Sequence, residues 1–302
     1  MTVTKRSFGQ RLAAAMTGKG PLCAGIDPHP HLLSAWGLND DVAGLAAFTE
    51  AAYRGLREAA ILKPQMAFFE RFGSAGIAVL QDLLTQARAD GVLTVVDVKR
   101  GDIGSTMDGY ASAYLECGAA LECDAITVSP YLGPAVFDAT ADLALRNAKG
   151  LFLLVLTSNP QAITLQRATL DLSGDNGAAP GFDEGGERAN VARLVLEWLN
   201  QRNHAELGGP VGSASLGSVI GATVEDVETV LGASLAANTG PILAPGFGAQ
   251  GASAQQIAQR FAPVRDKVLV NASRSLLSCG PQVEAMAEEV SRLQTELRNA
   301  LQ

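Results

Sequence analysis

Apolar residues gather along the chain into eight short runs, most of them rich in Val, Ile, Leu and Ala. A short continuous apolar run is typical of a strand buried on both faces, because a half-exposed strand would alternate apolar and polar residues. The sequence therefore predicts eight buried strands. They occupy residues 21–27, 60–69, 92–99, 124–130, 151–158, 216–223, 241–247 and 267–273.

Longer stretches between these runs carry apolar residues at helical spacing. In one stretch, Ile77, Leu80, Leu84 and Ala87 are three or four positions apart, so they would share one face of a helix. Alternating strands and helices imply parallel strands joined by right-handed crossovers. Comparable helical patterns occur in residues 41–58, 107–118, 134–148, 186–200, 224–237, 253–261 and 282–300.

The number of strand–helix units indicates the architecture. Eight units in a chain of 302 residues fit a closed (β/α)₈ barrel better than an open doubly wound sheet, which remains the alternative. A dinucleotide-binding open sheet needs a GxGxxG sequence at its first strand–helix junction, and this junction has none. We therefore predict an α/β protein with a single (β/α)₈ TIM-barrel domain over residues 1–302.

One connection is longer than the others. Residues 159–187 are rich in Gly, Asp and Pro and directly follow a predicted strand. A segment of this length exceeds an ordinary connection between a strand and a helix. It predicts a mobile, lid-like loop, with disorder that serves no function as the alternative.

The composition of the chain limits the expected cellular location and the expected binding partners. Hydrophobic residues make up 47% of the chain, yet no apolar run reaches 18 residues and the N-terminus lacks a secretory pattern. We expect a cytoplasmic protein with no membrane span. The net charge is −8, with 31 acidic and 23 basic residues, and this charge would repel a phosphate backbone. Nucleic acid is therefore not an expected partner.

Cysteine and histidine spacing gives little support for a metal site. The cysteines show no CxxC pairing, which favours reduced thiols over disulfides or zinc ligands. His29 and His31 flank Pro30 and could bind a metal, but no third ligand is obvious, so an ordinary loop is favoured. We predict no metal. The cysteines are Cys23, Cys117, Cys123 and Cys279.

The third predicted strand ends in a group of charges. Residues 92–106, VLTVVDVKRGDIGST, end an apolar run with Asp97, Lys99, Arg100 and Asp102. The two-residue period of a strand puts Asp97 and Lys99 on the same side, and nearby carboxylates favour the charged ammonium of a lysine. Such a lysine is a proton donor and not a nucleophile. Other polar residues in or at the ends of predicted strands are Asp27, Lys63, Ser129 and Ser158.

The segment DVKRGDIGST, residues 97–106, resembles the Asp-x-Lys-x-x-Asp motif of the orotidine 5′-phosphate decarboxylase family, in its longer-chain branch. A sugar-phosphate decarboxylase of the same superfamily shares this motif, so the remaining matches matter. They follow in the same order and extend across nearly the whole chain. These matches are GIDPHP (25–30), LKPQMAFFE (62–70), LTSNP (156–160), and PGFGAQG (245–251) followed by NASRSLL (271–277).

The resemblance implies a (β/α)₈ barrel that converts orotidine 5′-phosphate to uridine 5′-phosphate and CO₂ in pyrimidine synthesis, with no cofactor. Lys99 would give its proton to C6 of the pyrimidine. Asp27 and Lys63 would hold the ribose hydroxyls. These three residues would join Asp97 and Asp102 in a chain of alternating charges.

The resemblance also implies the remaining contacts of the nucleotide. Ser158 would bind the amide edge of the pyrimidine, and Gln250 and Arg274 would bind the phosphate. Asp102 and Thr106 would reach into the active site of a partner subunit, which implies a homodimer with shared sites. The chain departs from the family where Gln161 follows Ser-Asn-Pro, a place at which Gly is common.

Three other functions remain open from the sequence. One is a metal-dependent sugar-phosphate decarboxylase on the same barrel. A second is a Schiff-base aldolase using Lys63 or Lys99, which would need a lysine made neutral by desolvation. A third is a nucleotide-binding protein without catalytic activity, although the Asp97, Lys99 and Asp102 set disfavours it.

Overall fold

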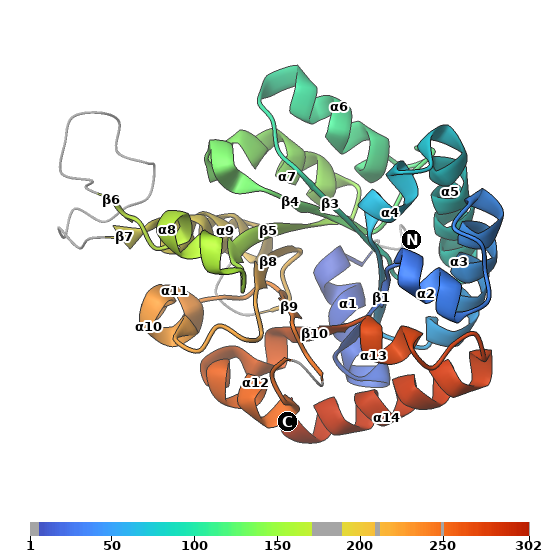
Figure 1. Cartoon of the computed structure of the whole chain (residues 1–302). Helices are drawn as coiled ribbons and strands as arrows, with labels where there is room; N and C mark the ends of the chain where they lie inside the picture. Colours follow the sequence, from blue (N-terminus) through green and yellow to red (C-terminus); the bar gives the residue numbers. More distant parts are fainter. Residues whose placement is uncertain (1–5, 171–188, 209–211, 249–250, 302) are drawn as a thin grey trace, which may run out of the picture.

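The computed structural model describes residues 6–170, 189–208, 212–248 and 251–301. Its main sheet holds eight parallel strands that pair in chain order (Figure 1). Isolated parallel bridges, Leu62 with Thr94 and Gln65 with Asp97, join the two edge strands β2 and β3. The strands are β1 Leu22–Ile26, β2 Ile61–Pro64, β3 Val95–Arg100, β4 Ala125–Val128, β5 Gly150–Leu156, β8 Leu216–Ile220, β9 Ile242–Pro245 and β10 Val268–Ala272.

This arrangement confirms the predicted (β/α)₈ barrel, and each of the eight predicted segments overlaps one barrel strand. Strands β3 and β5 extend one residue beyond their predicted segments, to Arg100 and from Gly150, and a larger difference concerns the second segment. The segment 60–69 is a strand only as far as Pro64, and α4, Met66–Glu70, follows it directly. Met66 and Phe69 are buried one helical turn apart. A short apolar run does not distinguish a strand from a strand followed by one turn of helix.

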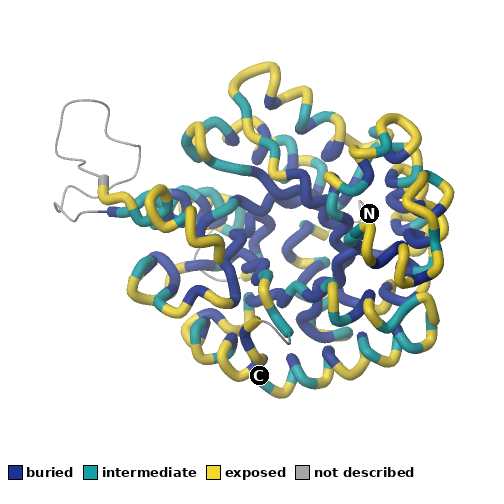
Figure 2. The backbone as a smooth tube through the Cα atoms, in the orientation of Figure 1, coloured by how far each residue is buried: buried dark blue, intermediate teal, exposed yellow. Residues whose placement is uncertain are grey.

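Helices surround the barrel and pack against the outward side chains of the strands. Figure 2 shows dark, buried strands inside a ring of helices whose outer faces are exposed. The longer helices are α1 Phe8–Lys19, α3 Val42–Leu56, α5 Gly73–Ala89, α6 Gly104–Leu115, α7 Asp138–Arg146, α9 Val191–Leu207, α12 Ala254–Arg260 and α14 Val283–Leu301. The shorter ones are α2 Pro30–Ala35, α8 Ile163–Gln166, α10 Val227–Leu231, α11 Ala233–Ala236 and α13 Arg274–Leu277, with 3-10 turns η1 Pro130–Leu132, η2 Pro134–Phe137, η3 Pro160–Ala162 and η4 Ala262–Lys267.

Helix α1 covers the amino-terminal end of the barrel, which is called the base below. It begins with a capping box in which Ser7 and Gln10 bond to each other's backbone N–H. Its Phe8 and Leu12 are fully buried among inward-facing strand residues, and Phe8 meets Phe152 edge-on at 6.1 Å between ring centroids. The base is therefore closed by apolar packing, which leaves the carboxyl ends of the strands as the open mouth.

The long segment 159–187 is described only as far as residue 170. Its described part contains η3, α8 and the two-residue strand β6, Thr169–Leu170, which pairs antiparallel with β7, Ala189–Asn190. Residues 171–187 lie outside the described residues, so a mobile loop remains a prediction. Within the described residues, none of the helices has the length and hydropathy that a membrane span requires.

Candidate active site at the barrel mouth

Charged side chains from three neighbouring strands form a continuous chain at the mouth. The Nζ of Lys63 on β2 lies 3.7 Å from Asp27 Oδ1, just after β1, and 3.2 Å from Asp97 Oδ2 on β3. The other oxygen of Asp97 lies 2.7 Å from Lys99 Nζ. Negative and positive groups thus alternate from Asp27 to Lys99, which brings four of the predicted site residues together.

Burial makes this charge cluster unusual. The side chains of Lys63 and Asp97 are only 7% and 10% exposed. Burial opposes ionisation of Asp97, but the ammonium groups of Lys63 and Lys99 and hydrogen bonds from Lys99 and Thr127 lower its pKa to about 2. Burial also disfavours the charged form of Lys63, yet Asp27 and Asp97 raise its pKa above the ordinary value. Lys63 and Asp97 therefore both stay ionised because neighbouring groups of opposite charge stabilise their charged forms.

Lys99 occupies a break in strand β3. Its φ is +46°, in the left-handed region that residues other than glycine rarely adopt, and the register against β4 shifts between Val96 and Arg100. Its side chain is 45% exposed although its ammonium is bonded to Asp97. Lys99 can therefore meet a ligand from the mouth while a buried carboxylate fixes its position.

Thr127 on β4 is part of this site, and the sequence analysis missed it. Its hydroxyl donates to Asp97 Oδ1 at 2.7 Å and accepts the backbone N–H of Lys99 at 3.0 Å. The two-residue period of the fourth predicted strand, with Ser129 at its end, was the available signal. It would have placed Thr127 on the inner face beside Asp97.

The fourth charge of the opening group, Arg100, has a different role. Its guanidinium pairs with Glu70 and lies over the ring of Tyr110, 5.4 Å from the ring centroid. The strand period turns this side chain away from Asp97 and Lys99 and towards the surrounding helices. Arg100 therefore links β3 to α4 and α6, and it stands outside the charge cluster.

The remaining predicted site residues lie around the mouth at greater exposure. Asp102, half-buried after β3, accepts the backbone N–H of Ile103 at 2.8 Å and makes no ion pair with the cluster among the described residues. Thr106 is exposed near the start of α6, Ser158 is exposed after β5, and Arg274 is exposed at the start of α13. The other predicted residue, Gln250, lies outside the described residues.

The histidines and cysteines considered as metal ligands in the sequence analysis lie in different surroundings. His29 packs on Phe68 with ring centroids 4.2 Å apart, and burial lowers its pKa. No group of three or more His, Cys, Asp or Glu residues that could hold a metal occurs in the described part of the chain. All four cysteines are free, but Cys117 is exposed where the others are buried or half-buried.

Cys23 lies beneath the charged cluster, one layer further into the barrel. It faces inward from β1 and is fully buried, and this burial raises the pKa of its thiol to about 12. Two residues further on, Gly25 leaves room for a neighbour, because a Cβ there would lie 1.9 Å from Ser273 Oγ. The floor under the cluster is thus uncharged and tightly packed.

Comparison with known proteins identifies the family. The family model described as "Orotidine 5′-phosphate decarboxylase / HUMPS family" matches residues 20–288. This chain belongs to that family. An orotidine 5′-phosphate decarboxylase of Salinispora arenicola is 45% identical over 296 residues, covering 98% of each chain. One from Streptomyces coelicolor is 44% identical over 97% of this chain and 98% of its own.

Solved structures of the orotidine 5′-phosphate decarboxylase family share the barrel. A crystal structure from Streptomyces avermitilis, assigned as an orotidine 5′-phosphate decarboxylase, matches with a TM-score of 0.85 at 42% identity, over 99% of this chain and 97% of that one. The OMP decarboxylase of Leishmania donovani matches with a TM-score of 0.68 at 26% identity, over 98% and 100%. The family membership predicted from the sequence is therefore confirmed.

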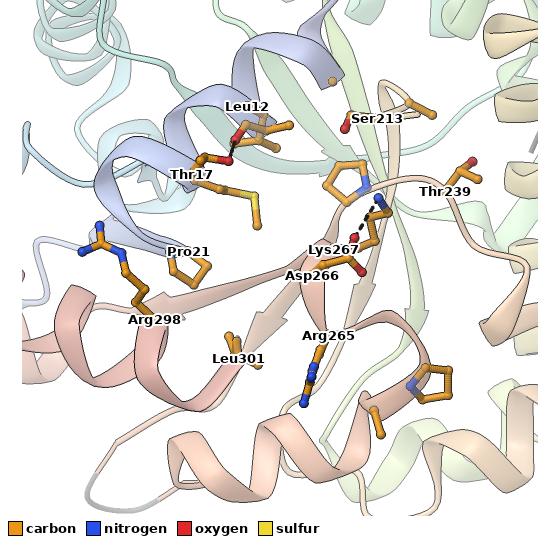
Figure 3. A pocket seen from close by; sticks show the side chains of 17 residues that line it. Leu12, Thr17, Pro21, Ser213, Thr239, Arg265, Asp266, Lys267, Arg298 and Leu301 are labelled. Carbon is orange, nitrogen blue, oxygen red and sulfur yellow. Dashed lines mark hydrogen bonds and ion pairs between the residues drawn. The ribbon is translucent and has the colours of Figure 1, made fainter. Parts of the chain in front are cut away.

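One cavity of this family member lies at the opposite end of the barrel from the charge cluster. It has a volume of about 670 Å³ and is lined by residues that directly precede strands, among them Pro21, Pro241 and Lys267 (Figure 3). Lys267 pairs there with its neighbour Asp266 at 3.0 Å. This cavity and the charge cluster thus lie at opposite ends of the barrel.

Proposed function

We propose that this chain is a carboxy-lyase that converts orotidine 5′-phosphate to uridine 5′-phosphate and CO₂ in de novo pyrimidine biosynthesis. The family and the named relatives at 44–45% identity support this activity. The observation that carries the proposal is the Lys63–Asp97–Lys99 cluster. It holds an ammonium at the mouth of the barrel against a buried carboxylate that stays ionised.

The chemistry requires such an ammonium. Loss of CO₂ from C6 leaves an electron pair in the plane of the pyrimidine ring, where the π system of the ring cannot delocalise it. A fixed positive charge beside C6 stabilises this carbanion as it forms, and a proton from the same group then completes the product. Lys99 takes this role in our proposal, and Asp97 keeps it charged and in place.

The neighbouring residues would bind the nucleotide. Asp27 and Lys63 take the ribose hydroxyls, and a buried oxygen of Asp27, Oδ1, lacks a hydrogen bond within the described residues. A buried acceptor of this kind is stabilised when a ligand hydroxyl donates to it. The other contacts follow the family resemblance, with Ser158 at the pyrimidine amide and Gln250 and Arg274 at the phosphate.

The reaction in this proposal needs no metal and no organic cofactor, because the carbanion is stabilised by a side chain of the protein. The metal-dependent sugar-phosphate decarboxylase remains a rival, since its branch shares the central motif. The Schiff-base aldolase is disfavoured by Lys63, because Asp27 and Asp97 raise the pKa of that lysine and keep it protonated. Borohydride trapping of substrate on Lys63 or Lys99 would favour the aldolase.

We propose a cytoplasmic homodimer in which one barrel domain, residues 1–302, shares its active site with a partner and closes it with a mobile loop, residues 159–187. Three exposed apolar side chains in the loops after β3 and β4 support an interface at the mouth. Ile103, Tyr131 and Leu132 follow β3 and β4 and are 61%, 76% and 50% exposed. Burying them against a second copy would remove apolar surface from water and bring Asp102 and Thr106 towards the partner's site.

The substrate is tested with two compounds. Purified protein is mixed with orotidine 5′-phosphate or, separately, with the phosphorylated 3-keto sugar acid that the rival would use. We expect absorbance loss only with the nucleotide, and chromatography should identify uridine 5′-phosphate as the product. Turnover of the sugar acid without turnover of the nucleotide would overturn the proposal.

A further inference from the structure

The backbone amide of Lys99 is held by a side chain where a sheet would normally use the backbone. β3 pairs with β4 in register at Val95 and Val96, and the pairing resumes only at Arg100. Between these points Lys99 adopts its left-handed conformation. A non-glycine residue remains in this conformation only when its surroundings hold it there.

The hydroxyl of Thr127 supplies that hold through two hydrogen bonds. Its oxygen accepts the N–H of Lys99 at 3.0 Å, and its proton goes to Asp97 Oδ1 at 2.7 Å. The same Oδ1 accepts the ammonium of Lys99 at 2.7 Å. The carboxylate of Asp97 therefore holds Lys99 at two points. It binds the ammonium directly, and it binds the backbone N–H through the hydroxyl of Thr127.

Burial strengthens this arrangement. Thr127 is 1% exposed, so water does not compete for its hydroxyl. On the same strand Ile126 and Val128 pack in the outer apolar core, while Thr127 takes the inward position. A valine would match the shape of Thr127 but could make neither bond, and it would leave the N–H of Lys99 without its acceptor.

We infer that Thr127 is a positioning residue for the decarboxylation: its hydroxyl fixes the backbone of Lys99 relative to Asp97 and so sets where the ammonium of Lys99 meets the substrate. The inference rests on the proposed function, in which Lys99 stabilises and protonates C6. Thr127 acts through Lys99 and Asp97 and needs no contact with the nucleotide.

The test compares Thr127→Val with Thr127→Ser. We expect the valine variant to lose about 10²-fold in kcat, the cost of a misplaced catalytic group, with KM for orotidine 5′-phosphate changed less than about threefold. The serine variant, which keeps the hydroxyl, should stay within about fivefold of wild-type kcat. A valine variant whose kcat lies within twofold of wild type would overturn the inference.

The pH profile gives a second measure that simple loss of packing would not change. The hydrogen bond from Thr127 favours the ionised form of Asp97, so removing it raises the pKa of Asp97. The acidic limb of kcat should therefore move to higher pH in Thr127→Val and remain in place in Thr127→Ser. An unmoved limb in the valine variant, at reduced kcat, would contradict the proposed link through Asp97.

Thr94→Val is the matched control. Thr94 is another buried threonine, 3% exposed, and its hydroxyl lies 3.5 Å from Asp124 Oδ2 near the base of the barrel. Its valine variant should keep wild-type kcat and pH profile, whatever it loses in melting temperature. If Thr94→Val lost as much kcat as Thr127→Val, the effect at Thr127 would be one of general packing, and the inference would be overturned.

A further variant covers the case in which Thr127→Val fails to fold. Thr127→Cys resembles Thr127→Ser in shape but offers only a weak hydrogen-bonding group, so its kcat should lie below that of Thr127→Ser. Equal kcat in the cysteine and serine variants would overturn the inference. Inactive wild-type protein would instead refute the proposed function, so the two failures are distinguishable.

Discussion

The two ends of this barrel carry similar ion pairs in very different surroundings. At the base, Lys267 and Asp266 lie 3.0 Å apart with side chains 25% and 69% exposed, beside a cavity of about 670 Å³. At the mouth, Lys63 and Asp97 lie 3.2 Å apart, and their side chains are only 7% and 10% exposed. Desolvated charge is costly, and its concentration at the mouth marks the functional end more reliably than empty volume does.

The largest effect should come from removing the exposed cation of the mouth. Lys99→Ala removes both the charge beside C6 and the proton donor, so kcat should fall at least about 10⁴-fold. Binding of uridine 5′-phosphate should stay measurable, because the main interaction of Lys99 forms in the transition state. Steady-state kinetics and calorimetry check the two parts. Retention of a tenth of wild-type activity would contradict the role of Lys99.

The proposed dimer predicts recovery of activity from two inactive variants. If Asp102 serves the partner's site, a mixed dimer of Asp102→Asn and Lys99→Ala subunits has one site with both lesions and one with neither. Mixing the two homodimers should restore up to about a quarter of wild-type activity through statistical pairing. If subunit exchange is verified by mass spectrometry and activity stays at the level of the parents, Asp102 acts within its own chain.

The mouth should also contribute a pH-dependent part of stability. The pKa of Asp97 is about 2 in the folded protein against an ordinary 3.8, so its contribution is complete above pH 4 and is lost as pH falls towards 2. This shift in the pKa of Asp97 corresponds to about 2 kcal/mol of folding stability. Chemical unfolding should show Asp97→Asn less stable than wild type at pH 7, with a smaller difference at pH 2.5. A difference that does not depend on pH would contradict this assignment.

The smallest effect is expected at the base. Lys267→Ala removes a lysine that is also paired with an aspartate, but the carboxylate of this pair is largely exposed and the pair should contribute less than about 1 kcal/mol to stability. Its kcat should equal that of wild type, which makes it the matched control for Lys99→Ala. A tenfold loss of kcat in Lys267→Ala would show that the two ends are coupled.

The sequence allowed prediction of the strands and of the charges that they carry. Uninterrupted apolar runs identified all eight strands, and the two-residue period placed Asp97 and Lys99 on one face. Lys63 was found because a charge inside an apolar run is expensive to bury. These features depend on the local sequence pattern. Once parallel strands pair in chain order, the charged residues at their carboxyl ends lie close together.

Features that depend on contacts between distant segments were not predicted. The left-handed backbone of Lys99 and its hydrogen bond to Thr127 occur at a break in the pairing between β3 and β4. No local sequence pattern predicts this break. The closure of the base by α1 was missed for a similar reason, since Phe8 and Leu12 become core residues only when the barrel is formed. The role of Asp102 depends on a second chain and remains a prediction.

The central claim is that an ammonium of the protein, and not a metal ion, stabilises the carbanion. The direct measurement is the rate of orotidine 5′-phosphate decarboxylation by protein treated with EDTA and assayed in its continued presence. The treated protein should retain the full rate of untreated enzyme, with no increase when Mg²⁺ is added in excess of EDTA. Activity that disappears in EDTA and returns with Mg²⁺ would contradict it.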